Sequence, residues 1–256
     1  MKLRHTSDEE LTKISALLFG ITGIGKTTSL DTLPEEGTLI LCGERGTLPL
    51  RLKNYQVLTF VDWTEIHWLI RACGNPEIVN DAEIKAAMQG AKIIVLDSLN
   101  ECSDVCIRQI VQVDRRIVML ERSEGKRDTP VKIYEEQMAK DDWGLYKTRM
   151  MNLMSALGHL PIHVIVNCLE GWREDKDGGV MLRTVALSGQ AARDAPSCFD
   201  LVLHMENATD QEGNPCRVWR TATDGEIIAK DGSRMLNEFE PTNWTDLFKK
   251  ILKGDK

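Results

Sequence analysis

The chain has 256 residues, of which 42% are hydrophobic and 28% charged, so it is long enough for one large folded domain with a sizeable core. Its formal net charge of −7 argues against a protein that coats nucleic acid, because such proteins usually carry an excess of Lys and Arg. Any contact with nucleic acid must then come from local basic loops, or depend on a bound nucleotide and on assembly.

Strand-like apolar runs alternate with helical patterns along the chain. The expected strands are residues 14–19, 38–42, 56–61, 92–96, 162–167 and 201–205. The expected helices are residues 27–33, 63–73, 99–121 and 141–157. The strand runs are continuous rather than alternating, which is typical of strands covered on both faces. This order predicts an α/β fold with a mainly parallel sheet sandwiched by helices.

The first expected strand leads into residues 20–27, "GITGIGKT", which fit the P-loop pattern G-x-x-x-x-G-K-[ST] at every fixed position. Glycines let the backbone close around an anion at the start of a helix, where N–H groups are unsatisfied. Lys26 is placed to reach the β- and γ-phosphates of a nucleotide, and the Thr27 hydroxyl to bind Mg²⁺. The residues expected to bind the nucleotide are Thr22, Gly23, Ile24, Gly25, Lys26, Thr27 and Thr28. The alternative is a glycine-rich turn that binds nothing.

A P-loop also needs a carboxylate that holds the metal ion, usually at the end of a buried strand. The apolar run "KIIVL" is followed directly by Asp97, which we expect to bind Mg²⁺ together with Thr27. The alternative is that Asp97 caps the helix that begins near Ser98.

Hydrolysis requires a group that orients or deprotonates the attacking water. The residue after Asp97 is Ser98, so the Asp-Glu pair of many motor ATPases is missing. Glu44, just past the second strand in "LILCGERG", is the preferred candidate, because ligands of open α/β sheets bind at that edge. Glu101 is its competitor.

Asn167 ends the next apolar strand, in "VIVNC". Its amide could bind the γ-phosphate or the attacking water, or it could be an ordinary turn-forming Asn. The charged, glycine-containing stretch 170–180 follows and is predicted to be a β-hairpin. The alternative is a mobile loop that contacts single-stranded DNA, with Trp172 stacked on a base and Arg173 on a phosphate.

Five blocks of the sequence resemble a known family. They are "GITGIGKTT", "VDWTEI", "IIVLDSL", "DDWGLYKTRMMNLMSALGHLPIHVIVN" and "ALSGQAARDAPSCFDLVLHM". In this order they are similar to the phage-encoded RecA-like P-loop ATPases, the AAA-domain phage nucleotide-binding proteins that include the Sak-type single-strand annealing ATPases. The resemblance covers about residues 13–252.

The resemblance implies a RecA-like core, ATP and Mg²⁺ as ligands, and assembly of identical subunits into a ring or filament. It also implies phage recombination on single-stranded DNA, with a single-strand-binding protein as a partner. By position it assigns the catalytic glutamate to Glu44 and an amide sensor to Asn167. Lys230 and Arg234, in "IIAKDGSRML", match a late basic element that reaches a neighbouring subunit's γ-phosphate. The alternative for this pair is a solvated turn.

We expect one RecA-like ATPase domain over residues 1–256, with an N-terminal arm at 1–13 and a mobile loop at 122–130. No apolar run approaches the length of a membrane span, and the start of the chain lacks the pattern of a signal peptide. The seven cysteines are expected to be free thiols, with Cys102 and Cys106 packed on one helical face. We therefore expect a cytoplasmic protein, in the host cytoplasm if a phage encodes it.

The preferred interpretation is a Mg²⁺-dependent ATPase that acts on single-stranded DNA in recombination or annealing. The alternative, from another class, is an ATP-driven switch that recruits partner proteins without binding DNA. A small-molecule kinase is disfavoured, because no arginine-rich lid is evident. The rate of ATP hydrolysis with and without single-stranded DNA distinguishes the first two.

Overall fold

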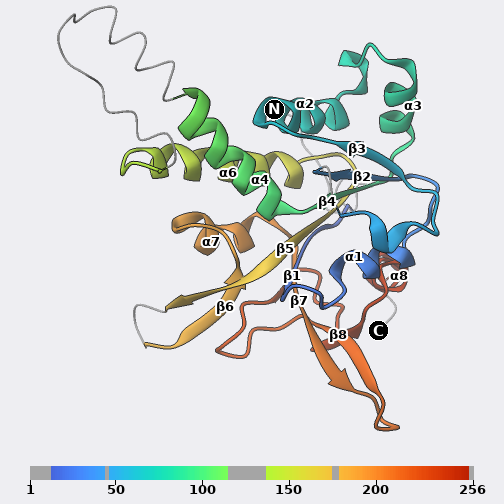
Figure 1. Ribbon diagram of the computed structural model, residues 1–256. Coiled ribbons are helices and arrows are strands. Elements are labelled where there is room, and N and C mark those ends of the chain that lie inside the picture. The colour runs from blue at the N-terminus through green and yellow to red at the C-terminus, as the bar shows by residue number, and fades with distance from the viewer. Residues whose placement is uncertain (1–12, 44–45, 115–136, 175–178, 254–256) are drawn as a thin grey trace, which may run out of the picture.

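The computed structural model describes residues 13–43, 46–114, 137–174 and 179–253 (Figure 1). Its strands are β1 (Ser15–Gly20), β2 (Thr38–Cys42), β3 (Gln56–Thr59), β4 (Ile93–Asp97), β5 (His163–Glu174), β6 (Met181–Val185), β7 (Leu201–Thr209), β8 (Pro215–Arg220), β9 (Lys230–Asp231) and β10 (Phe239–Pro241). Its α-helices are α1 (Lys26–Ser29), α2 (Trp63–Gly74), α3 (Ala82–Gly90), α4 (Leu99–Arg108), α6 (Asp142–Gly158), α7 (Gln190–Asp194) and α8 (Trp244–Lys253).

The strands form one sheet in the order β10-β8-β7-β1-β5-β4-β2-β3. The strands from β7 to β3 in this order are parallel, whereas β8 and β10 extend the sheet in antiparallel fashion. The strand that precedes the P-loop, β1, therefore lies between β5 and β7. β1 and β4 end at one edge of the sheet, where Leu18 and Asp97 are both level with Asn167 of the longer strand β5.

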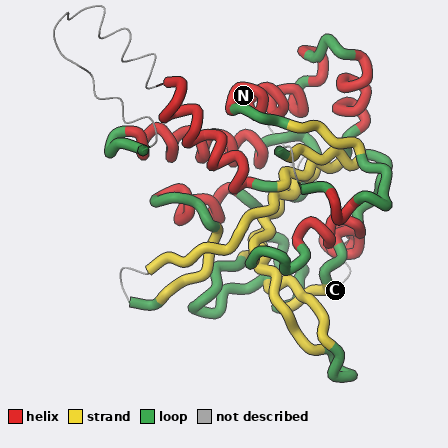
Figure 2. The backbone as a smooth tube through the Cα atoms, viewed as in Figure 1, coloured by secondary structure: helices red, strands yellow, loops and turns green. Residues whose placement is uncertain are grey.

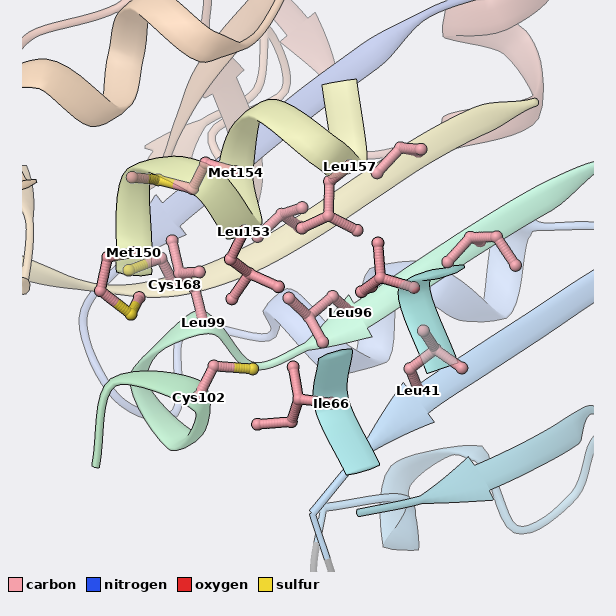
Figure 3. Packing of buried hydrophobic residues seen from close by; sticks show 14 of the residues in the cluster. Leu41, Ile66, Leu96, Leu99, Cys102, Met150, Leu153, Met154, Leu157 and Cys168 are labelled. Carbon is pink, nitrogen blue, oxygen red and sulfur yellow. The ribbon is translucent and has the colours of Figure 1, made fainter. Parts of the chain in front are cut away.

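Helices cover both faces of this sheet (Figure 2). One face packs against α2, α4 and α6, in a core that includes Ile66, Leu96, Cys102 and Leu153 (Figure 3). The other face packs against α1 and α8, where the Trp219 and Trp244 rings lie 4.4 Å apart. The central strands β1, β2 and β4 are buried along nearly their whole length, which accounts for their continuous apolar sequences.

Side-chain caps fix where the helices on the first face begin. Asp62 accepts a hydrogen bond from the Glu65 N–H at the start of α2, and Asp81 caps α3 in the same way. Ser98 and Glu101 form a capping box at the start of α4. None of the helices in the described residues is long and apolar enough to cross a membrane.

The predicted α/β class is confirmed: a mainly parallel sheet lies between helices. Each expected strand is present, but β5 and β7 continue beyond their predicted ends. The helix expected over residues 99–121 is α4, which ends at Arg108 and passes into a π-helical turn over Gln109–Asp114. Cys102 and Cys106 are both buried, as expected.

Several predicted features lie outside the described residues: Glu44, residues 1–12 of the arm, residues 115–121 of the helix and the loop at 122–130. The expectation of a single domain over the whole chain stays a prediction.

Candidate functional site

The P-loop joins β1 to α1 at the carboxyl edge of the sheet. Gly23 and Gly25 have φ angles of 79° and 108°, in the left-handed region that glycine adopts readily. The Lys26 ammonium donates hydrogen bonds to the carbonyl oxygens of Gly20 at 2.8 Å and Ile21 at 2.9 Å. The lysine therefore spans the loop, in the position from which it can bind the phosphates that the loop would enclose.

Lys26 is nine-tenths buried, which makes its charge costly. Burial lowers the pKa of the Lys26 ammonium, while the charges of Asp97 and Glu170 act in the opposite direction. The Lys26 ammonium is buried at a glycine-rich loop, so it would gain a negatively charged partner in direct contact when an anion binds in that loop.

Asp97 and Thr27 come together although they lie far apart in the sequence. The Thr27 hydroxyl donates a hydrogen bond of 2.6 Å to Asp97 Oδ2. Burial raises the pKa of the Asp97 carboxyl, and the Thr27 hydrogen bond and the Lys26 charge oppose that rise. The alternative in which Asp97 caps α4 is wrong, because Ser98 is the capping residue.

Asn167 lies beside Asp97 in the middle of β5 and is fully buried. Neither its amide nitrogen nor its amide oxygen has a hydrogen bond of good geometry among the described residues. The Asn167 amide nevertheless acts to lower the pKa of Asp97, and so favours the charged form of that carboxyl group. The turn-forming alternative is wrong, because β5 runs through Asn167 to Glu174.

These groups fit a nucleotide and a divalent cation. Hydroxyl and carboxylate oxygens are the ligands that Mg²⁺ prefers, so Thr27 and Asp97 would hold it. The glycine-rich backbone and Lys26 provide donors for phosphates, and the unpaired Asn167 amide offers one further donor and one acceptor. The Mg²⁺ and ATP assignments of these residues stay predictions, although their convergence is what such a site requires.

The competitor for water activation, Glu101, is engaged elsewhere. Its Oε2 accepts hydrogen bonds from the N–H of Gly43 at 3.1 Å and of Ser98 at 3.2 Å. Burial raises the pKa of this carboxyl, and the two N–H donors lower it. Glu101 thus ties the end of β2 to the start of α4, a structural role that leaves Glu44 as the preferred base.

Lys230 and Arg234 do not lie at the P-loop. Lys230 is in β9, level with Val202 near the start of β7, and its ammonium donates to the Phe199 carbonyl oxygen at 2.7 Å. Phe199 lies at the amino edge of the sheet. At about 3.3 Å per residue, the length of β1 places this edge roughly 20 Å from the P-loop. Within one subunit this pair is therefore not part of the nucleotide site, and its predicted action on a neighbour stays a prediction.

Glu170–Glu174 of β5 pair antiparallel with Met181–Val185 of β6, so the start of the stretch predicted as a hairpin is one strand of a hairpin, while residues 175–178 lie outside the described residues. Trp172 is 58% exposed on this hairpin. The Arg183 guanidinium lies 4.9 Å from the centre of the Trp172 ring. The hairpin therefore presents an aromatic ring and a cation together, five residues beyond Asn167 along β5.

Sequence reasoning missed a buried pair beside the P-loop. His204 Nε2 lies 2.7 Å from Glu170 Oε2, and both side chains are nearly inaccessible. Glu206 approaches the other ring nitrogen at 3.4 Å. The pair bridges β5 and β7 across the end of β1, and Glu170 favours the charged form of Lys26. The one sequence signal was a histidine inside the otherwise apolar run "LVLHM".

A family model described as "AAA domain" matches residues 12–233, which include the P-loop, Asp97 and Asn167. Among solved structures, the crystal structure of the RadB recombinase matches with a TM-score of 0.39 and 15% sequence identity, over 85% of this chain and 90% of that chain. Comparison with curated proteins gives no significant match.

Proposed function

Because this chain belongs to the AAA domain family and is a P-loop NTPase, we propose that it binds and hydrolyses ATP with Mg²⁺ and acts on single-stranded DNA. The observation that carries the ATPase is the convergence of Lys26, Thr27, Asp97 and Asn167 at one edge of the sheet, with the Asn167 amide buried and unpaired.

Each side chain has a distinct task in this proposal. Lys26 binds the β- and γ-phosphates and stabilises the charge that develops during transfer. Thr27 and Asp97 hold the metal ion, which when bound neutralises charge on the phosphate oxygens. Asn167 binds the γ-phosphate or orients the attacking water. Glu44 accepts a proton from that water.

The test of this function is the rate of ATP hydrolysis with Mg²⁺, measured with and without single-stranded DNA. We expect turnover in wild type that DNA accelerates, and no turnover in Lys26→Ala. Hydrolysis that requires neither Mg²⁺ nor Lys26 would contradict the ATPase proposal.

The β5–β6 hairpin supports the proposed contact with DNA. Its root is Glu170, close after Asn167 on the same strand, so a change at the nucleotide can reach the hairpin through β5. Base stacking on Trp172, with Arg173 or Arg183 on a phosphate, would give binding without sequence preference. Trp172→Ala should weaken binding of an oligothymidylate by about tenfold, because stacking contributes about 1–3 kcal/mol per base. Trp68→Ala, which removes a partly exposed tryptophan from α2, is the matched control.

The second candidate is an ATP-driven switch that recruits partner proteins without touching DNA. The formal charge of −7 favours it, since phosphate-rich partners are repelled by an acidic surface. Turnover that is unaffected by DNA, together with a Trp172→Ala protein that behaves like wild type, would favour the switch. By its resemblance to phage annealing ATPases, the chain would work in phage recombination with a single-strand-binding protein.

We further propose that Lys230 or Arg234 acts on the nucleotide of a neighbouring copy, in a head-to-tail ring or filament. Cations supplied across an interface in this way raise rates by about 10³ to 10⁵ in other systems. The test mixes Lys26→Ala subunits with Lys230→Ala/Arg234→Ala subunits. Recovery of turnover that neither protein shows alone is expected. Normal hydrolysis by the double variant on its own would contradict the proposal.

A further inference from the structure

An arginine of β8, two strands away from β1 in the sheet, lies against the P-loop. Arg217 is in β8, and its guanidinium packs against Gly25, the glycine that precedes Lys26. A Cβ atom at Gly25 would lie 2.6 Å from Arg217 Nη1 and 3.1 Å from Cζ. The positive φ of Gly25 disfavours a side chain at that position, and the absence of a Cβ atom leaves room for the guanidinium beside the loop.

Strand pairing holds Arg217 in this place. β8 pairs with β7 along its whole length, with Arg217 opposite Asn207, and β7 pairs with β1. The hairpin of β7 and β8 projects beyond the rest of the sheet at the bottom of Figure 1. Trp219, two residues further along β8 and so on the same face, is fully buried and packs against the tilted ring of Trp244 of α8. Arg217 thus lies on the α1 face, at the edge where the P-loop begins.

Arg217 carries a charge that no carboxylate of the described residues neutralises. It is exposed and has no ion pair or hydrogen bond among the described residues. Its neighbour on the same strand, Arg220, differs: its guanidinium contacts Glu206 at 3.2 Å and Asp224 at 3.1 Å. A guanidinium that has no ion pair among the described residues and lies against a phosphate-binding loop is suited to binding an anion.

We propose that Arg217 binds the α- and β-phosphates of the nucleotide in its own subunit. Asp97 on β4 and Arg217 on β8 lie on opposite sides of β1, so Arg217 approaches from the side away from the metal ligands. The loop that it touches is the part of a P-loop that encloses the α- and β-phosphates. This inference rests on the proposed binding of ATP and adds to it a residue outside the P-loop motif.

The proposal predicts that ADP and ATP are affected alike. Removing one hydrogen-bonded charge from a phosphate should weaken binding about ten- to a hundredfold. Arg217→Ala should therefore lose this factor for both ADP and a non-hydrolysable ATP analogue, while Arg217→Lys keeps part of the affinity. Because Arg217 is exposed, its variants should unfold at the wild-type temperature without nucleotide.

The experiment is calorimetric titration of Mg-ADP and the Mg-bound ATP analogue into wild type, Arg217→Ala, Arg217→Lys and Lys26→Ala. Lys249→Ala, which removes an exposed cation from α8, is the charge-matched control and should bind like wild type. Wild-type affinity in Arg217→Ala, beside a loss in Lys26→Ala, would overturn this inference and leave the ATP site standing. Loss for the ATP analogue alone would move the contact to the γ-phosphate and overturn the assignment. A wild type that binds neither nucleotide would overturn both proposals.

Discussion

The two edges of the central sheet differ in how their polar groups are satisfied. At the amino edge, the N–H and the hydroxyl of Ser15 both donate to Asp200 Oδ2, at 2.9 and 2.7 Å. The Asp200 N–H donates back to Ser15. Lys13 and Lys230 each donate to a backbone carbonyl oxygen at 2.7 Å. These contacts join β1, β7 and β9 to their neighbours.

At the carboxyl edge the polar groups are buried but incompletely paired. Both polar atoms of Asn167 lack a hydrogen bond of good geometry, and Lys26 and Asp97 have pKa values shifted toward their neutral forms by burial. Further buried side-chain atoms without such a bond lie in the β5–β6 hairpin that continues from this edge, in Arg173, Arg183 and Thr184.

An unpaired buried polar group costs about 1–3 kcal/mol, and most are paired in folded proteins. The amino edge therefore follows the general rule, and its polar groups stabilise the fold. The carboxyl edge departs from the rule where a ligand is proposed to bind. The same kind of substitution should then have different consequences at the two edges.

The largest expected effect is on ATP turnover, when a lysine at the carboxyl edge and a lysine at the amino edge are each replaced by alanine. Lys26→Ala should lower ATP turnover by about a hundredfold or more, because a charge-assisted contact to the phosphates is lost, while the protein stays folded. Lys13→Ala removes a lysine of the amino edge and should keep wild-type turnover. Steady-state hydrolysis of the two variants measures the contrast. Equal turnover in the two variants would break it.

The next effect concerns two glutamates near the end of β2. Glu44→Gln should bind ATP but hydrolyse it about a hundredfold more slowly, because the amide keeps the shape and loses the base. Glu101→Gln should be nearly neutral, since glutamine also completes a capping box. Single-turnover rates beside binding constants separate the two roles, and an exchange of the two phenotypes would show that Glu101 activates the water.

A smaller effect is expected at Asn167. Asn167→Leu keeps the branched shape of the side chain and removes two polar atoms that lack a hydrogen bond of good geometry, so the ligand-free protein should be about as stable as wild type. Turnover should fall about tenfold or more, because one donor to the phosphate or water is lost. Chemical denaturation and hydrolysis rates are compared on the same preparation. A large loss of stability would mean that Asn167 serves the fold.

The sequence predicted the parallel half of the fold well because those strands are buried on both faces. β2 was predicted with its observed bounds, since "TLILC" is wholly apolar apart from its first residue. β8, "PCRVWR", was missed because it is partly exposed and its burial depends on α8. α8 itself could have been predicted: Trp244, Leu247, Phe248 and Ile251 recur at helical spacing.

The residues of the candidate site likewise fall into a group that the sequence could predict and a group that it could not. Lys26, Thr27 and Asp97 belong to motifs whose spacing carries their chemistry, so the sequence alone was sufficient to select them. Glu170 and Arg217 reach the P-loop only through the pairing of β1 with β5 and β7, and no spacing in the sequence encodes that approach. Their position follows from the topology of the sheet.

The most direct test of the contrast compares the same substitution at the two edges, by unfolding with and without Mg-ADP at neutral pH. Burial raises the pKa of Asp97, so its charged form destabilises the fold above that pKa, and a neutral amide removes this cost. Asp97→Asn should therefore be at least as stable as wild type without ligand, yet lose most of the stabilisation by Mg-ADP. Asp200→Asn should stay close to wild type without ligand, because the amide oxygen can still accept the two hydrogen bonds from Ser15, and should keep the full stabilisation by Mg-ADP. A destabilised Asp97→Asn that Mg-ADP stabilises as it does wild type would contradict the assignment of the carboxyl edge to the ligand.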